Sequence, residues 1–431
     1  MFSATATGLE RLQSVTGCTP AAPQYFNQAW QYNNLNQLTE IDTSAQYNGY
    51  PSGSPNPGGA TYFFARYAFS ATANNGQITG MSDARTGNTI SYTYDLLKRV
   101  TGATTTAGTS WGQSFGYDGF GNLVSKSVPA GSSEFPLPGV NANKNWLNGS
   151  TYDQNGNVTT LNNATLGYDM ENRLNSYTSG TLVENYAYDE GNRRVEKYNT
   201  SGADTVYFYG PNGKLLSVLT VQINASAPLL TLKTSTNRIY FGRMLLGTST
   251  GYATNDGDVV KDRLGSAKPS YPYGTDIGAQ TIEGDDFATY WKDYTTGFQY
   301  AMNRYYSASY GRFLTVDPFG GSASTESPGS WNRYSYAEGG PLNSLDSTGR
   351  EIVDLGSGTC AVGTGEYEED VNYDYWAVSF QLPIGIGGGG GGSSSGVTWN
   401  SLSATCQQHL VRLSEDGGYL HAVDVRRDRH G

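Results

Sequence analysis

A Tyr-Asp pair recurs along the middle of the chain, and most copies are followed by a polar turn and then an aliphatic residue. The five pairs end in aspartates separated by 23, 35, 16 and 20 residues, which are Asp95, Asp118, Asp153, Asp169 and Asp189. The segments YDGFGNLVSKSV, YDQNGNVTTL, YDMENRLNSY and YDEGNRRVEKY show the pattern most clearly. A chain of this kind must reverse direction after each pair, so the repeat restricts the fold more than any other feature.

Each part of the repeat has a physical role in a β-hairpin. The tyrosine ends a strand and packs its ring on a neighbouring ring. The aspartate accepts hydrogen bonds from backbone N–H groups two residues on, and glycine or asparagine supplies a positive φ angle. One hairpin cannot bury its apolar face alone, so we predict an all-β fold of stacked antiparallel hairpins. The alternative, a β-sandwich with chance Tyr-Asp pairs, does not explain the residues that follow the pairs.

The composition agrees with many short strands. The 431 residues include 56 glycines and 33 tyrosines, and only 15% are charged, too few for disorder driven by charge repulsion. The net charge of −11 argues against nucleic-acid binding by the repeats, and residues 351–431 contribute −7 of it from eleven acidic and four basic residues. The three cysteines, Cys18, Cys360 and Cys406, do not form a disulfide framework.

The chain lacks the usual sequence signals for membranes and classical export. No apolar run approaches the length of a transmembrane helix, so we expect no membrane span. The first residues, MFSATATGLERLQSVTG, lack the charged and apolar regions of a signal peptide. We therefore expect either export by a non-classical or specialised route, or a sequence that is a piece of a longer protein.

We predict four regions along the chain. These are degenerate repeats in residues 1–90, the Tyr-Asp repeat sheet in 91–261, a dense aromatic block in 262–350 and a variable C-terminal region in 351–431. After Thr205 the repeats lose the aspartate but keep a strand–turn–strand pattern. In the last region, YDYWAVSFQL is typical of a strand, residues 385–396 of a flexible linker, and WNSLSATCQQHLVRL of an amphipathic helix.

The order of motifs in residues 262–350 resembles one known domain. DRLGS and YPYG are followed by RYYSASYGRFLTVDP, NRYSY, PLN and a final Asp-x-x-Gly. In this order the motifs are similar to the RHS-repeat-associated core domain of bacterial polymorphic toxins, and the Tyr-Asp pairs resemble the YD repeats of the RHS family. The resemblance covers residues 90–350 and, more weakly, residues 25–90.

The resemblance implies a specific architecture. In the RHS family the repeats form one long β-sheet that spirals into a hollow shell, the core domain closes one end, and a variable C-terminal toxin is often held inside. Spiralling pairs most strand edges, which protects them from aggregation. Because the repeat region here is short, we expect a truncated protein or an open, partial shell rather than a closed particle with a large void.

Many members of the family cut themselves after the core, by chemistry that resembles an aspartic protease. Two neighbouring carboxyl groups cannot both ionise easily, so one activates water and the other supplies a proton. The matching residues here are Asp317 and Asp346, and Arg312 and Arg333 are candidates for a neighbouring cation. Whether the chain is an enzyme depends on this single self-cleavage.

The predicted cleavage region, Gly349, Arg350 and Glu351, departs from the family pattern. The family ends in Asp-Pro-x-Gly-Leu, whereas this chain has Ser347 in place of the proline and Arg350 in place of the leucine. Loss of the proline frees the turn, and a charged side chain docks poorly in an apolar pocket. From the sequence we favour the alternative interpretation, in which both aspartates only cap turns.

The aromatic block allows two interpretations. Its rings could stack on a carbohydrate or form an aromatic core that plugs the shell, and we favour the second. The residues are Tyr290, Trp291, Tyr294, Phe298, Tyr300, Tyr305, Tyr306 and Tyr310. In the same block we expect Asp293 and Arg304 to be buried partners.

The C-terminal tail could be a toxic payload. All three histidines and a basic cluster lie in its last 23 residues, namely His409, His421, His430, Arg426, Arg427 and Arg429. A toxin would use such histidines as a general base or as metal ligands. The tail has no HNH-like, Cys-x-x-Cys or His-Glu-x-x-His pattern, so we favour a degenerate or truncated end and predict no metal or cofactor.

Three hypotheses for function follow. The first is an encapsulating β-shell fragment of a secreted or surface toxin system. The second is a cell-surface module that binds a carbohydrate or a partner cell. The third is an autoprotease that acts once, which is compatible with the first. The partners predicted are the chain's own C-terminal segment, a secretion-system component or a carbohydrate.

Overall fold

The structure is a computed structural model that describes part of the 431-residue chain. The described residues are 3–7, 11–18, 25–44, 61–130, 137–200, 203–211, 213–224, 230–241, 244–249, 257–258, 261–278, 283–323, 325, 328–355, 414–416 and 419–421. The strand, linker and helix predicted within residues 373–413 lie outside them.

The N-terminal part of the chain forms a ten-stranded sheet in which each strand pairs antiparallel with the next. The strands are β1 (Ser3–Thr7), β2 (Arg11–Cys18), β3 (Tyr25–Tyr32), β4 (Leu38–Ser44), β5 (Thr61–Phe69), β6 (Ile78–Asp83), β7 (Asn88–Tyr94), β8 (Val100–Ala107), β9 (Gly112–Tyr117) and β10 (Leu123–Ala130). A short hairpin of β11 (Val140–Asn141) and β12 (Trp146–Leu147) follows. This meander has the local pairing that successive hairpins require.

A second sheet of eleven strands has the same consecutive antiparallel order. Its strands are β13 (Thr151–Tyr152), β14 (Val158–Leu161), β15 (Ala164–Tyr168), β16 (Leu174–Ser179), β17 (Leu182–Tyr188), β18 (Arg194–Asn199), β19 (Ala203–Tyr209), β20 (Leu215–Ile223), β21 (Leu230–Phe241), β22 (Met244–Ser249) and β23 (Gly257–Asp258). Both sheets confirm the predicted all-β fold of stacked hairpins.

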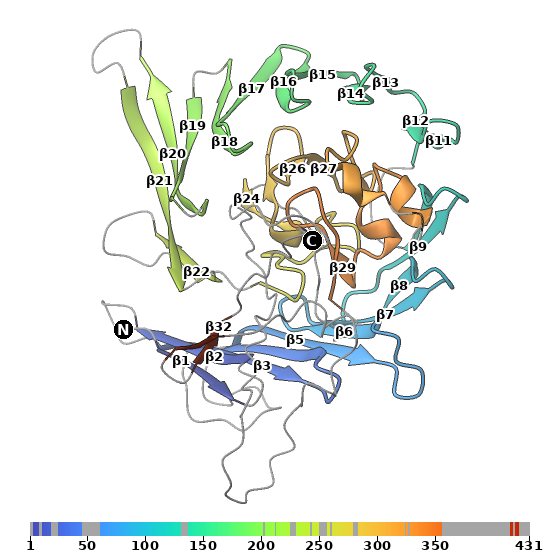
Figure 1. Cartoon of the computed structure of the whole chain (residues 1–431), viewed down its shortest axis with the longest axis vertical. Coiled ribbons are helices and arrows are strands. Elements are labelled where there is room, and N and C mark those ends of the chain that lie inside the picture. The colour runs from blue at the N-terminus through green and yellow to red at the C-terminus, as the bar shows by residue number, and fades with distance from the viewer. Residues whose placement is uncertain are drawn as a thin grey trace, which may run out of the picture.

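The block of residues 262–350 is built from short elements. It has five paired strands, β24 (Gly284–Asp285), β25 (Trp291–Lys292), β26 (Gln299–Tyr300), β27 (Tyr305–Ser307) and β28 (Arg312–Phe313), and 3₁₀ turns η1 (Phe287–Thr289), η2 (Gly320–Ser322), η3 (Pro328–Trp331) and η4 (Ala337–Gly339). Two hairpins complete the described chain: β29 (Ser344–Leu345) with β30 (Val353–Asp354), and β31 (Ser414–Asp416) with β32 (Tyr419–His421). The repeat strands follow one another around this block, which lies in the middle (Figure 1).

The turn chemistry predicted for the repeats is confirmed at all five aspartates. One carboxylate oxygen accepts the N–H groups of the second and fourth residues after the aspartate at 2.8–3.0 Å. The other oxygen accepts the side chain of the fourth residue at 2.7–2.8 Å. The third residue has a positive φ angle, as predicted for glycine or asparagine, except that Lys98 takes this position in the first turn.

The repeat tyrosines do more than pack on other rings. The hydroxyl groups of Tyr117 and Tyr188 donate to the carbonyl oxygens of Val100 and Leu174, at 2.7 and 2.6 Å. Each of these acceptors is the first residue of the strand that follows the preceding turn. The guanidinium of Arg173 lies 5.0 Å from the centre of the Tyr188 ring and also donates to the carbonyl of the next repeat aspartate. These two units are therefore fixed to their neighbours by polar contacts as well as by packing.

The degenerate units keep the same turn without the aspartate. Asn33 accepts the N–H groups of Leu35 and Gln37 on its side-chain oxygen, at 2.9 and 3.0 Å. Gly210 has only the backbone part of the turn, donating to Lys214 O at 2.8 Å. The prediction that later repeats lose the aspartate but keep the strand–turn–strand pattern is confirmed by β19 and β20 on either side of this turn.

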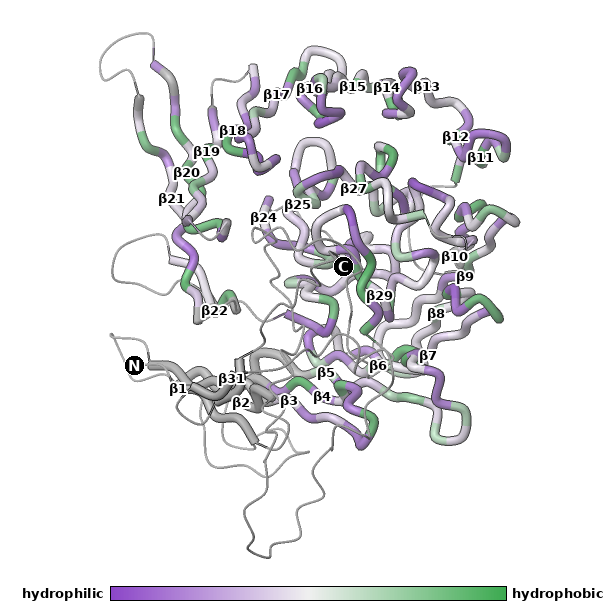
Figure 2. The backbone as a smooth tube through the Cα atoms, in the orientation of Figure 1, coloured by the Kyte–Doolittle hydropathy of each residue, from purple (hydrophilic) through white to green (hydrophobic). Residues whose placement is uncertain are grey.

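Both sheets bury apolar side chains against the central block. One cluster joins repeat residues such as Ile90 and Phe115 to Phe287 and Phe313 of the block. A second joins Leu166, Leu174 and Tyr186 to Phe298, Tyr305 and Leu314. Hydrophobic and hydrophilic stretches alternate along the strands and through the block (Figure 2), as expected when each strand has one covered face.

Apolar residues of the block pack against both sheets. Within the described residues, no strand pairing joins the ten-stranded sheet, the eleven-stranded sheet and the five strands of the block. Most of the predicted aromatic set is buried there, namely Tyr290, Phe298, Tyr305, Tyr306 and Tyr310, whereas Tyr294 is 60% exposed. This arrangement agrees with an aromatic core inside a partial shell.

Replacing Asp189 with alanine should lower the free energy of unfolding by about 1–3 kcal/mol, because the N–H groups of Gly191 and Arg193 and the Arg193 guanidinium lose a charged acceptor. The matched control is alanine at the neighbouring exposed Glu190, which should change stability by less than about 0.5 kcal/mol. Urea unfolding followed by tryptophan fluorescence measures both. Equal effects of the two substitutions would contradict the role given to the aspartate turn.

Candidate functional site

Asp317 lies at a turn that follows the last strand of the five-stranded sheet. Its Oδ1 accepts the N–H of Phe319 at 2.8 Å, and its own N–H donates to the carbonyl of Arg333 at 3.1 Å. The residue is 9% exposed. The aspartate therefore caps its turn, and its second oxygen remains available for another partner.

Asp346 follows β29 and is almost completely buried. Its Oδ1 accepts the N–H groups of Arg350 and Glu351, at 2.9 and 3.2 Å. Its backbone carbonyl accepts the hydroxyl of Tyr290, which belongs to the aromatic core. The carboxylate thus sits inside the turn that carries the predicted cleavage region.

Arg304 brings the two aspartates together. Its Nη2 lies 2.7 Å from Asp346 Oδ2 and 3.4 Å from Asp317 Oδ2. The guanidinium packs over the Phe313 ring at 3.5 Å, and its Nη1 donates to the carbonyl of Arg333 at 3.1 Å. Two carboxylates that are 29 residues apart in the sequence therefore share one buried cation.

The two arginines predicted as the neighbouring cation make other contacts than with the two carboxylates. Arg312 donates to the carbonyl of Asn145 and lies over the Tyr334 ring at 4.7 Å. Arg333 donates to the backbone carbonyl of Asp317 rather than to its carboxylate, at 2.5 Å. Sequence reasoning placed Arg304 in the block as a buried residue but did not connect it to the aspartates, because no spacing pattern links residues 304 and 346.

Burial raises the pKa of Asp346 to about 6. The largest cause is desolvation, which disfavours the charged form, and the nearby Asp317 adds to it. The Arg304 guanidinium and the N–H of Arg350 act in the opposite direction. Asp346 can therefore take up a proton in mildly acidic solution.

The residues of the predicted cleavage region pack tightly on the block. Gly349 has a φ of +72°, and a Cβ there would lie 2.9 Å from the carbonyl oxygen of Ala301, so other side chains are excluded. Arg350 lies with its guanidinium 5.7 Å from the Phe319 ring and is only partly buried. The charge of Arg350 is therefore accommodated near an aromatic ring instead of in an apolar pocket.

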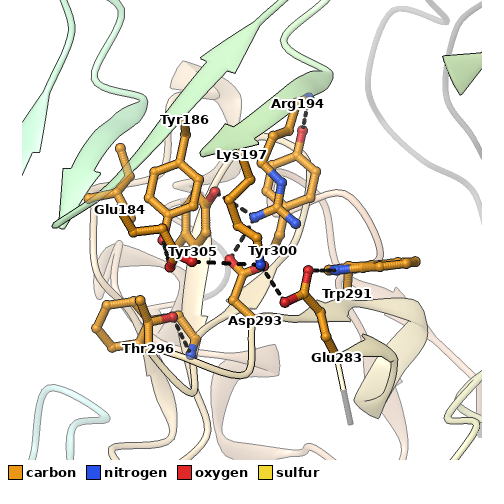
Figure 3. A network of polar contacts seen from close by, with 12 residues as sticks. Glu184, Tyr186, Arg194, Lys197, Glu283, Trp291, Asp293, Thr296, Tyr300 and Tyr305 are labelled. Carbon is orange, nitrogen blue, oxygen red and sulfur yellow. Dashed lines mark hydrogen bonds and ion pairs between the residues drawn. The ribbon is translucent and has the colours of Figure 1, made fainter. Parts of the chain in front are cut away.

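A second polar cluster anchors the block to the repeat sheet (Figure 3). Arg194 of β18 and Asp293 of the block are both fully buried and form an ion pair at 2.6 Å. Lys197, on the same strand, contacts Glu283 and lies 3.7 Å from Glu184. The prediction that Asp293 and Arg304 are buried partners is correct as to burial, but each is paired with another residue.

Within the described residues, no group of histidine, cysteine and acidic side chains could hold a metal ion. The side chains of the three histidines lie outside the described part of the chain. Over the same described part, no helix is long and apolar enough to cross a membrane.

Comparisons with known proteins show what the repeats are similar to. The teneurin YD-shell family model matches residues 72–223. The chain is 31% identical over 263 residues to the tRNA3(Ser)-specific nuclease WapA of Bacillus spizizenii, and 30% identical over 260 residues to the tRNA nuclease WapA of Bacillus subtilis. These matches support an RHS/YD-repeat protein. Each match covers 55% of this RHS/YD-repeat chain but only 11% of the WapA protein.

Solved structures agree with this RHS/YD-repeat fold. TcdB2-TccC3 without its hypervariable C-terminal region aligns with a TM-score of 0.60 over 80% of this chain and 19% of its own, at 18% identity. The Photorhabdus luminescens Tc holotoxin pore aligns with a TM-score of 0.59 over 85% of this chain and 19% of its own, at 17% identity. The described chain therefore has the fold of one part of a YD-repeat shell.

Stability should fall as the pH rises from about 4 to about 6, because native Asp346 keeps its proton up to about pH 6 whereas the unfolded carboxyl releases it near 3.8. This contribution, about 3 kcal/mol, is fully present below the unfolded pKa and is lost above the folded pKa. Urea unfolding at several pH values, with Asp346→Asn as reference, measures it. Parallel pH profiles for the two proteins would contradict the raised pKa.

Proposed function

We propose that this chain is the encapsulating β-shell segment of a toxin-type RHS protein, and that its core block cuts the chain once at the stretch from Gly349 to Glu351. The observation that carries the proposal is that Asp317 and Asp346 share the buried Arg304, and that Asp346 belongs to the turn that would be cut. The released piece would be residues 351–431 or a fragment close to them.

The fold supports an enclosing role for the repeats. The strands follow one another around the core block, and their edges are paired in chain order. The WapA relatives are named as tRNA nucleases, and TcdB2-TccC3 has a hypervariable C-terminal region. By analogy, the variable residues 351–431 would be the cargo of this shell. Export of this cargo, a secretion-system partner and a target of the cargo are further predictions.

Turn capping does not account for the whole site. Each aspartate uses one oxygen to accept backbone N–H groups, as a capping residue does. Their remaining oxygens both face Arg304. A buried cation shared by two carboxylates is costly to build and is not needed for either turn, so it favours a chemical role.

The groups present can divide the work of hydrolysis. Asp317 would take a proton from an attacking water molecule, while Asp346 would supply one to the departing amide nitrogen. The raised pKa of Asp346 suits it to the donor role. Arg304 would hold the ionised carboxylate and offset the charge that develops in the transition state.

Intact mass spectrometry of the purified chain should find a break at this stretch. Asp317→Asn and Asp346→Asn should each abolish it, because each removes one proton-transfer group. Asp153→Asn is the matched control, since Asp153 makes the same type of turn contacts without Arg304 and should leave cleavage unchanged. An uncut wild-type chain, or cleavage that survives both test substitutions, would refute self-cleavage.

The cleavage rate should fall by about tenfold per pH unit above about pH 6, because ionised Asp346 has no proton to donate. The rate constant can be measured after cell-free synthesis at fixed pH. Samples are quenched in denaturant and analysed by intact mass spectrometry. A rate that rises through pH 6 to 8 would reverse the roles given to the two aspartates.

A further inference from the structure

Lys197 is a buried lysine that points from the repeat sheet towards the core block (Figure 3). Its Nζ contacts Glu283 Oε2, and lies 3.6 Å from Asp293 Oδ1 and 3.7 Å from Glu184 Oε1. Glu283 comes from the block side of this interface and is 86 positions away in the sequence. An amine and a carboxyl group from two separate parts of the fold are therefore held against each other, largely away from water.

The other oxygen of the Glu283 carboxyl group faces two hydrogen-bond donors. Trp291 Nε1 and the Tyr207 hydroxyl both donate to Glu283 Oε1, each at 3.4 Å. Two donors on one oxygen stabilise the negative charge that develops there when a nucleophile attacks the carboxyl carbon. Oε1 is thus placed to carry that charge, and Oε2 lies beside the lysine nitrogen.

The charges around Lys197 do not balance when every group is ionised. Three carboxyl groups, those of Glu184, Glu283 and Asp293, face the two cations Lys197 and Arg194. Burial raises the pKa of Glu184, and the nearby Asp293 and Glu283 act in the same direction, against Lys197. A proton held on Glu184 makes the cluster neutral and leaves the Asp293 carboxylate beside the amine as a base.

We propose that Lys197 and Glu283 condense to an intramolecular isopeptide bond, which joins the repeat sheet covalently to the core block. The bond links strand β18 to the residue that precedes β24. This proposal concerns how the partial shell is held together, and it does not depend on the self-cleavage proposed above.

The reaction releases one water molecule and needs no other reactant. One proton passes from the Lys197 ammonium group to Glu283 Oε2, which gives a neutral amine beside a carboxylic acid. The Nζ electron pair then forms a bond to Glu283 Cδ, and the C=O π electrons move to Oε1. Asp293 takes a second proton from the nitrogen and passes it to Oε2, so the bond between Cδ and Oε2 breaks and water leaves. The third proton stays on the amide nitrogen, and no atom is oxidised or reduced.

The buried setting favours the amide over the ion pair. A lysine and a carboxylate held away from water lose solvation that their mutual attraction only partly repays, whereas an amide carries no net charge. The remaining ion pair of Arg194 and Asp293, at 2.6 Å, keeps its charges balanced after the condensation. The product therefore leaves no unpaired charge in the cluster.

A second lysine of the block provides an internal comparison. Lys292 contacts Asp276 Oδ2 and lies 3.7 Å from Asp286 Oδ2. Asp276 Oδ1 is buried and has no hydrogen-bond partner in the part of the chain that the structure describes. This carboxyl group lacks the two donors that face Glu283 Oε1, so we expect Lys292 to keep an unmodified side chain.

Mass spectrometry of a tryptic digest tests the bond. Trypsin cannot cut after a modified Lys197, so one branched peptide should join residues 195–214 to residues 264–292 and weigh less than their sum by one water molecule. This branched peptide is expected whether or not the chain is also cut near Gly349, so the two proposals fail separately. A wild-type digest that contains the free peptide 195–197 and no branched peptide would overturn the proposal. A branch at Lys292 in its place would overturn it as well.

Substitutions assign the two ends of the bond. Lys197→Arg keeps the positive charge but not the amine, and Glu283→Ala removes the carboxyl group, so neither variant should contain a branched peptide. Lys126→Arg is the matched control and should retain it, because Lys126 also reaches the block but donates to the carbonyl of Ser309, at 3.1 Å. A branched peptide that persists in either test variant would show that other residues are joined, which contradicts the assignment.

Discussion

The carboxylate that folds back onto its own turn is the contact on which the rest of this structure depends. It accepts the N–H groups of the second and fourth following residues in each Tyr-Asp unit, so the chain reverses at a fixed point. The fourth side chain then reaches the next unit, as Arg173 does when it contacts the carbonyl of Asp189 and lies over the Tyr188 ring. Turn geometry therefore sets the register of the strands and the stacking of the repeats together.

The candidate cleavage turn is a variant of this same device. Asp346 accepts the N–H of its fourth residue, Arg350, and the third residue, Gly349, has a positive φ. In the repeats an arginine at the fourth position bonds to its own aspartate, as Arg193 does to Asp189 at 2.7 Å. Here the Arg350 guanidinium lies by Phe319 instead, and Asp346 Oδ2 is taken by Arg304. A structural turn becomes a candidate reactive site when the second carboxylate oxygen of its aspartate contacts a buried arginine that is distant in the sequence.

The sequence predicted what is local and missed what is assembled in three dimensions. The turns at Asp95 to Asp189 and the loss of aspartate at Gly210 followed from residue order, because their contacts span only a few positions. The Arg194–Asp293 and Arg304–Asp346 pairs join residues 99 and 42 positions apart. No periodicity in the sequence encodes such pairs. Arg312 and Arg333 were therefore predicted as the cation, whereas Arg304 is the arginine that contacts both carboxylates.

An experimental structure of the Asp317→Asn chain, at a resolution that resolves side chains, would test the account most directly. The substitution should keep the chain whole, so the intact turn can be seen. The account predicts that Arg304 contacts Asp346 and residue 317 together. A structure in which residues 317 and 346 lie apart, each with its own solvent-exposed turn, would contradict it.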